Sequence, residues 1–299
     1  MPVTRVPCRM VAAIALAMLP LAAQAHVPDA ASPAPQWEFD PWVVASLLAF
    51  STLYALGIYR LWSCSRQGAG VPVWRAGCFF AGLCVVVAAL VSPLDALGAQ
   101  LFSMHMLQHE LLMLIAAPLL VAGSPLAVFL WAFAQASRRR IGQLARASVV
   151  RSAWHALTLP LVAWVLHAAV LWIWHAPSLF QASLVNDTVH ALQHAAFLLS
   201  ALLFWSSLSG TVRAGPALVY ILTTAIHSGM LGALLTFSPG AWYPVYAGRT
   251  EVWGLSLLED QQLGGLIMWV PAGFVLLGAG LAFAAKVIHP GGGVRPAWK

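Results

Sequence analysis

The sequence predicts an all-α, polytopic membrane helical bundle: seven transmembrane helices after a signal peptide, with the N-terminus outside and the C-terminus in the cytoplasm. Three observations support this prediction. Of the 299 residues, 61% are hydrophobic and only 8% are charged, whereas charged residues form about a quarter of a soluble domain. Apolar runs of about 20 residues, the length that crosses a bilayer, recur along the chain. Basic residues collect in alternate connections between these runs, as they do in cytoplasmic loops.

The first 40 residues divide into two predicted segments. Residues 1–25 carry Arg5 and Arg9, a short apolar run and then Ala23-Gln24-Ala25, a pattern typical of a cleaved signal peptide. An uncleaved first helix is the alternative. Residues 26–40 are rich in proline and alanine and have no apolar period, so we expect a periplasmic tether there.

The seven-helix transmembrane domain is predicted over residues 41–286, followed by a cytoplasmic tail, 287–299. The apolar runs place the spans near 41–62, 72–92, 100–122, 154–174, 186–208, 216–237 and 262–285. The apolar stretch from Leu101 to Ala136 is too long for one crossing, and Gly123-Ser124-Pro125 marks a break within it. Residues 126–136 are then expected to lie along the inner interface. In this topology twelve basic residues are cytoplasmic, while all nine acidic residues lie on the outer side with Arg249.

Charge and cysteine content exclude two classes of function. The net charge of +6 comes from scattered basic residues, which do not form the basic, aromatic-interleaved surface of a nucleic-acid-binding protein. The four cysteines contain no C-x-x-C pair, so they predict neither a disulfide framework nor a thiolate metal site. Nucleic acid is therefore not an expected partner. The lipid bilayer is the expected surrounding because of the hydrophobic composition.

Five histidines share the outer layer of the predicted bundle. His105 and His109 lie in the third span, His190 and His194 lie in the fifth, and His175 closes the fourth. Both pairs are spaced i, i+4 in a repeated H-x-L-Q-H pattern, which brings two imidazoles to one helix face, near enough to ligate one metal ion. Hydrated or helix-bonded histidines are the alternative. We predict a metal site formed by these five residues.

Methionine extends the histidine stripe. Met113 follows His109 by one helical turn, and Met104 and Met106 flank His105. A thioether beside imidazoles favours copper, especially Cu(I), over magnesium or calcium. Met113 is therefore added to the predicted ligands, although methionine is also a common apolar filler.

The seventh span opens with three polar residues, Asp260, Gln261 and Gln262, followed by Gly264 and Gly265. Small glycines permit close helix approach, which would bring these polar side chains to the histidine layer. There they are expected to orient the imidazoles through hydrogen bonds. An ordinary polar helix start is the alternative.

Several of these stretches, spread over most of residues 40–285, resemble the CtaG family of cytochrome c oxidase assembly proteins, the multispanning type associated with caa-type oxidases. The resembling stretches are Met104 to Pro118 with Gly123-Ser124-Pro125, Trp174 to Pro177, His190 to His194, Ser238 to Tyr246, and Asp260 to Pro271. The resemblance implies a multi-pass protein of the bacterial cytoplasmic membrane that is needed to make active oxidase. Copper supply is the usual proposal for such a factor, and oxidase subunits are the implied partners.

The leading hypothesis is a non-enzymatic assembly factor that binds copper in the outer leaflet and hands it to a nascent oxidase subunit. A membrane metallohydrolase with zinc is a second possibility, although Glu110 follows the second histidine and so no H-E-x-x-H is present. A haem protein with paired axial histidines is a third. The fourth is copper permeation through His167, His227 and Met230.

Overall fold

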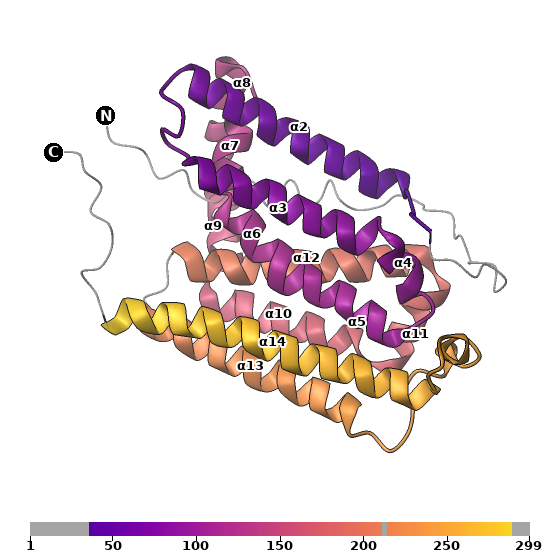
Figure 1. Ribbon diagram of the computed structural model, residues 1–299. Coiled ribbons are helices and arrows are strands. Elements are labelled where there is room, and N and C mark those ends of the chain that lie inside the picture. Colours follow the sequence, from indigo (N-terminus) through magenta and orange to yellow (C-terminus); the bar gives the residue numbers. More distant parts are fainter. Residues whose placement is uncertain (1–35, 211–213, 289–299) are drawn as a thin grey trace.

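The computed structural model (Figure 1) describes residues 36–210 and 214–288, and no strand occurs in those ranges. The predicted signal peptide, residues 26–35 of the tether and the tail from residue 289 lie outside them. The described end of the tether, residues 36–40, is not helical. Its Glu38 N–H donates to the Val91 carbonyl at 3.0 Å, so the chain enters the bundle beside the end of the second described helix.

The elements follow one another in the order α2 Pro41–Ser63, α3 Val73–Leu90, α4 Pro93–Gly98, α5 Phe102–Glu110, η1 Leu111–Ala116, α6 Ala117–Ala122, α7 Pro125–Trp131, α8 Gln135–Leu144, α9 Ser148–Leu157, α10 Pro160–Trp174, α11 Pro177–Val185, α12 Asp187–Gly210, α13 Ala214–Thr236, η2 Pro244–Tyr246, η3 Thr250–Trp253 and α14 Leu257–Ile288. The prediction of an all-helical membrane protein is confirmed, since six of these helical stretches are long and apolar enough to cross a bilayer.

The fourth expected span, 154–174, is divided in the structure. Helix α9 ends at Leu157 and α10 begins at Pro160, with a bend of 63° between them. Proline has no N–H to continue the helical ladder, so it favours a new start at this point. With 15 residues, α10 is about 22 Å long, shorter than the roughly 30 Å hydrocarbon core. Seven full spans are therefore present only if the bent pair counts as one.

The two ends of the bundle differ in what they carry. At one end lie α4, α11, the η2–η3 connection and the first turns of α5, α12 and α14 (Figure 1); we call this the histidine end. Helices α7 and α8 lie at the opposite end, where α8 carries Arg138, Arg139 and Arg140. The charge asymmetry read from the sequence is thus present between the two ends of the bundle.

The break expected at Gly123-Ser124-Pro125 is confirmed. Helix α6 stops before Gly123, Ser124 adopts a left-handed backbone with φ of 51°, and Pro125 begins α7. The Tyr54 hydroxyl on α2 donates to the Gly123 carbonyl at 2.8 Å. Because Val128 and Phe129 are buried, the segment after the break packs into the bundle through α7.

Glycines allow α14 to lie directly against its neighbours, as the sequence predicted. A Cβ atom on Gly265 would lie 2.6 Å from the Gly232 carbonyl oxygen of α13, and one on Gly264 would collide with the Phe102 ring of α5. Only a residue without a side chain fits such contacts. The beginning of α14 is thereby held against the beginning of α5.

Candidate metal centre

The first turn of α5, which leads into His105 and His109, is capped by a carboxylate from another helix. Asp260 of α14 is fully buried and accepts hydrogen bonds from the Phe102 N–H at 2.6 Å, the Ser103 N–H at 3.1 Å and the Ser103 hydroxyl at 2.5 Å. Free N–H groups and the helix dipole make a helix N-terminus favourable for an anion. Leu101 at the N-cap position makes no side-chain capping bond, so Asp260 does this in its place.

Three imidazoles, which we call the trihistidine cluster, converge between α5 and α12. One ring nitrogen from each of His105, His109 and His194 lies within 4.8 Å of the other two. The ring centres are 4.5 Å apart for His105–His109, 5.5 Å for His105–His194 and 5.3 Å for His109–His194. Imidazoles bound at tetrahedral angles to one ion, with bonds of about 2.0 Å, have ring centres about 5 Å apart. The spacing of the rings therefore fits three ligands of one ion.

The cluster contains several ring nitrogen atoms whose hydrogen-bonding capacity is unsatisfied. Both ring nitrogens of His109 and Nε2 of His194 and of His190 are buried without a hydrogen-bond partner. Buried polar atoms in proteins are nearly always paired, and neutral imidazole nitrogens are common metal ligands. The donor set therefore fits a metal ion that prefers nitrogen, such as copper or zinc.

His190 joins the cluster from the side, together with a carboxylate that sequence reasoning missed. Its ring centre lies 4.2 Å from that of His194 and 5.2 Å from that of His105. Asp95 of α4 forms a second group with His190 and His194, with ligand atoms within 4.8 Å of one another. Burial raises the pKa of Asp95 to about 6, although a hydrogen bond from Gln108 opposes the shift. The two H-x-L-Q-H pairs thus meet in one layer.

The glutamines of the repeated motif have defined partners, which sequence reasoning did not assign. Gln193 Oε1 lies 3.2 Å from His105 Nε2. Gln108 Nε2 donates to the Ala89 carbonyl at 2.8 Å and to Asp95 Oδ1 at 2.6 Å. Such contacts orient ligands and their neighbours. The signal was available, since the glutamine recurs in both copies of the motif.

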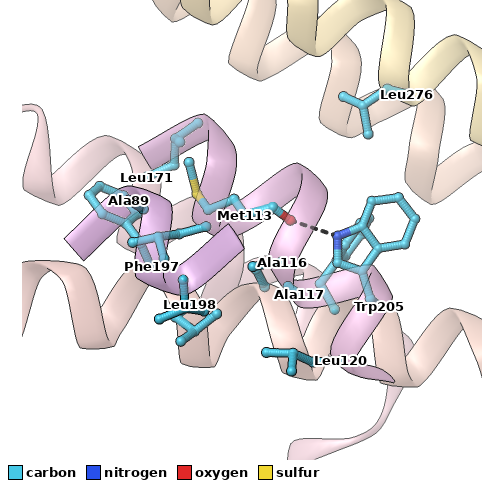
Figure 2. Close-up of a cluster of buried hydrophobic side chains, with 14 of the residues drawn as sticks. Ala89, Met113, Ala116, Ala117, Leu120, Leu171, Phe197, Leu198, Trp205 and Leu276 are labelled. Carbon is cyan, nitrogen blue, oxygen red and sulfur yellow. Dashed lines mark hydrogen bonds between the residues drawn. The ribbon is translucent and has the colours of Figure 1, made fainter. Parts of the chain in front are cut away.

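Met113, whose role as a ligand stays a prediction, follows the point where α5 continues into a π-helical turn. In η1 the Ala117 N–H donates to the Leu112 carbonyl, five residues earlier, so the side chains that follow are rotated from their α-helical positions. Figure 2 shows Met113 among apolar side chains, with its carbonyl accepting from Trp205 Nε1 at 3.0 Å. It lines a small pocket with Glu110 and His167.

His175, also a predicted ligand, lies beside the trihistidine cluster. Its ring centre is 6.0 Å from that of His109. Its Nδ1 lies 2.6 Å from the Leu171 carbonyl, and its Nε2 lies 3.4 Å from the Met106 sulfur.

Gln261 and Gln262 contact backbone atoms of the α13–α14 connection. Gln261 Oε1 accepts from the Trp242 N–H at 2.5 Å, and Gln262 Nε2 donates to the Ser238 carbonyl at 3.5 Å. The side chains expected to orient imidazoles thus hold the connection that covers the histidine end. From that connection the Tyr246 hydroxyl reaches the Gly98 carbonyl at 3.0 Å and lies 3.5 Å from His105 Nδ1.

The deeper histidines contact other side chains, and Met230 lies on the surface of the bundle. His167 Nδ1 lies 3.1 Å from Ser200 Oγ, and His227 packs its ring against Trp164. Met230 is 52% exposed on the outside of the bundle. These positions give no support to the permeation path considered from the sequence.

Comparison with known proteins agrees with the resemblance noted from the sequence. The chain is 26% identical over 247 residues to uncharacterized proteins of Mycobacterium bovis and Mycobacterium tuberculosis, and 25% identical to one of Mycobacterium leprae. Each match covers 78% of this chain and 36% of the relative, so the chain spans about a third of the length of these curated relatives. No solved structure matches it. The family model described as cytochrome c oxidase caa3 assembly factor (Caa3_CtaG) matches residues 52–289. The chain belongs to the cytochrome c oxidase caa3 assembly factor family.

Proposed function

We propose that this protein binds copper at the trihistidine cluster and delivers it to a subunit of cytochrome c oxidase during assembly, without catalysing a reaction. The observation that carries the proposal is the convergence of three imidazoles whose ring nitrogens lie within 4.8 Å of one another. Membership of the family supports the oxidase as client. Imidazole ligands bind copper yet exchange more readily than a closed cage of thiolates, which suits transfer.

The surroundings of the cluster favour copper over haem. Two imidazoles on opposite sides of a haem iron have ring centres about 6 Å apart, with the macrocycle between them. Five ring-centre distances among the four histidines of the two H-x-L-Q-H pairs run from 4.2 to 5.5 Å. The rings contact one another directly, so there is no slot for a planar macrocycle.

The orientation in the membrane follows from the charges. We propose that the histidine end faces the periplasm and that the arginines of α8 face the cytoplasm, because basic residues are retained on the cytoplasmic side. The site then lies in the outer leaflet of the bacterial cytoplasmic membrane, where copper is passed to the oxidase from the outside.

A zinc-dependent membrane hydrolase is the second candidate, and one observation favours it. Three histidines with an open fourth position form a catalytic zinc site in some enzymes, and Asp95 lies beside His190 and His194. Glu110, the carboxylate next to the motif, instead lines the pocket with Met113 and His167. Bound zinc with turnover of a lipid or peptide substrate would replace the copper proposal.

The test combines metal content with oxidase assembly. The full chain is purified in detergent and loaded with Cu(I), and the same variants are expressed in cells that lack the native gene. Replacing His105, His109 and His194 together by alanine is expected to abolish copper retention and oxidase activity. His155→Ala is the matched control, because His155 is exposed on α9 at the other end. Normal oxidase assembly with the triple variant would refute the proposal.

A further inference from the structure

Beside the trihistidine cluster, two buried atoms that both accept hydrogen bonds face each other. Met106 of α5 is fully buried and His175, at the end of α10, is 2% exposed. The Met106 sulfur lies 3.4 Å from His175 Nε2. The sequence analysis noted Met106 as a flanking neighbour of His105 in the stripe of histidines and methionines.

Counting hydrogens shows that this contact lacks a donor. A neutral imidazole has one ring hydrogen, and a thioether has none. His175 Nδ1 lies 2.6 Å from the Leu171 carbonyl, which can only accept, so the hydrogen is on Nδ1. Phe180 and Phe197 flank the ring, and an apolar setting opposes a second proton because it would create a desolvated cation. The lone pair of Nε2 therefore points at a sulfur lone pair.

A soft cation would satisfy both atoms at nearly their present separation. With bonds of about 2.0 Å to nitrogen and about 2.3 Å to sulfur, two ligands at a tetrahedral angle are about 3.5 Å apart, against the 3.4 Å observed. Thioether and imidazole together select Cu(I) among biological metals. We propose that Met106 Sδ and His175 Nε2 form a second Cu(I) position, distinct from the trihistidine cluster.

His109 connects the two positions. Its ring centre lies 4.5 Å from that of His105 on one side and 6.0 Å from that of His175 on the other. Both of its nitrogens are buried without a partner, so this ring is free to ligate at either position. Cu(I) moves between the two by exchange of ligands, with no change of oxidation state. The identity of the ion rests on the proposed function; the ligand pair rests on its own geometry.

The experiment counts Cu(I) ions and detects sulfur separately. The full chain is labelled with selenomethionine, purified in detergent, titrated anaerobically with Cu(I) against a chromogenic chelator, and examined by X-ray absorption at the selenium edge. Wild type is expected to bind two equivalents and to show a copper–selenium distance. Met106→Leu keeps the side-chain volume and is expected to bind one equivalent without that distance. Met104→Leu, on the same helix, is the matched control and should behave as wild type.

A second pair of variants separates this proposal from the proposed function. His105→Ala with His194→Ala is expected to remove the trihistidine ion but to keep one equivalent and the copper–selenium distance. His175→Gln tests the partner ligand independently of Met106 and is expected to lose that distance. If wild type shows no copper–selenium distance, or if Met106→Leu leaves it unchanged, the second position is refuted. The proposed function would still stand in that case if the protein bound one copper ion through nitrogen ligands and lost it when the cluster histidines were replaced.

Discussion

Replacing Asp260 is expected to loosen the helix that carries His105 and His109, although Asp260 contacts neither imidazole. Its carboxylate accepts three hydrogen bonds from Phe102 and Ser103. In Asp260→Ala the Ser103 hydroxyl can turn to another acceptor, but two backbone N–H groups are left buried without one. At about 1–3 kcal/mol for each unsatisfied donor, the free energy of unfolding falls by about 2–6 kcal/mol. Asp260→Asn keeps one neutral oxygen acceptor, so its cost is about 1–2 kcal/mol.

Hydrogen exchange followed by mass spectrometry measures this loss of local stability directly at the start of α5. Each 1.4 kcal/mol changes an equilibrium constant tenfold, so exchange of the amides around Ser103 should be at least about 30-fold faster in Asp260→Ala. Asp260→Asn should show an increase of about tenfold. Glu251→Gln is the control, since Glu251 is exposed at the same end of the bundle. Wild-type exchange rates in Asp260→Ala would refute the capping role assigned to this carboxylate.

Three further variants test other parts of the account by thermal unfolding in detergent. In metal-free protein the raised pKa of Asp95, about 6, means that the folded state holds a proton which the unfolded chain releases above its ordinary pKa of 3.8. The contribution of this one group to the free energy of unfolding therefore falls by about 2–3 kcal/mol as pH rises from 4 to 6 and then levels off. The difference in free energy of unfolding between wild type and Asp95→Asn should change by that amount over this range, and a difference that is constant with pH would contradict the assignment. Gly265→Ala should lower the free energy of unfolding by about 2–3 kcal/mol, because its methyl group meets the backbone of α13. Gly273→Ala is the control and should be neutral, because its methyl group meets nothing within 4 Å. Equal melting temperatures for the two variants would contradict the close contact at Gly265. Trp205→Phe should lower the free energy of unfolding by about 1–2 kcal/mol, because the Met113 carbonyl in the π-helical turn loses its hydrogen-bond donor. Trp253→Phe loses an exposed hydrogen bond and should lower it by less. A larger loss in Trp253→Phe than in Trp205→Phe would contradict the stabilising role of the Trp205 hydrogen bond.

The sequence was sufficient to predict the helices and the layer that holds the histidines. Long apolar runs give the helices, and the i, i+4 spacing puts His105 beside His109 and His190 beside His194 whatever the neighbouring helices do. The i, i+4 spacing predicts which side chains share a face of one helix. It does not give the rotation of α5 relative to α12, which depends on tertiary packing, so the composition of the trihistidine cluster required the structure.

Two features explain why other ligand assignments could not be read from spacing. The π-helical turn after Glu110 changes the helical period where Met113 was expected to continue the stripe, so the i, i+4 spacing does not fix the direction of that side chain. Asp260 was expected at the imidazoles, but it binds the backbone of the helix that bears them. Both effects depend on contacts between segments far apart in the chain, such as the 158-residue separation of Phe102 and Asp260. Local periodicity carries no information about them.

The most direct test of the copper proposal is X-ray absorption at the copper edge, on protein loaded with one equivalent of Cu(I). Three histidines as ligands predict nitrogen neighbours at about 2.0 Å, with the outer-shell scattering of three imidazole rings. His194→Ala should reduce that scattering to two rings, and His155→Ala should leave all three. A spectrum that shows no imidazole rings, or one that His194→Ala leaves unchanged, would contradict the trihistidine cluster as the copper site.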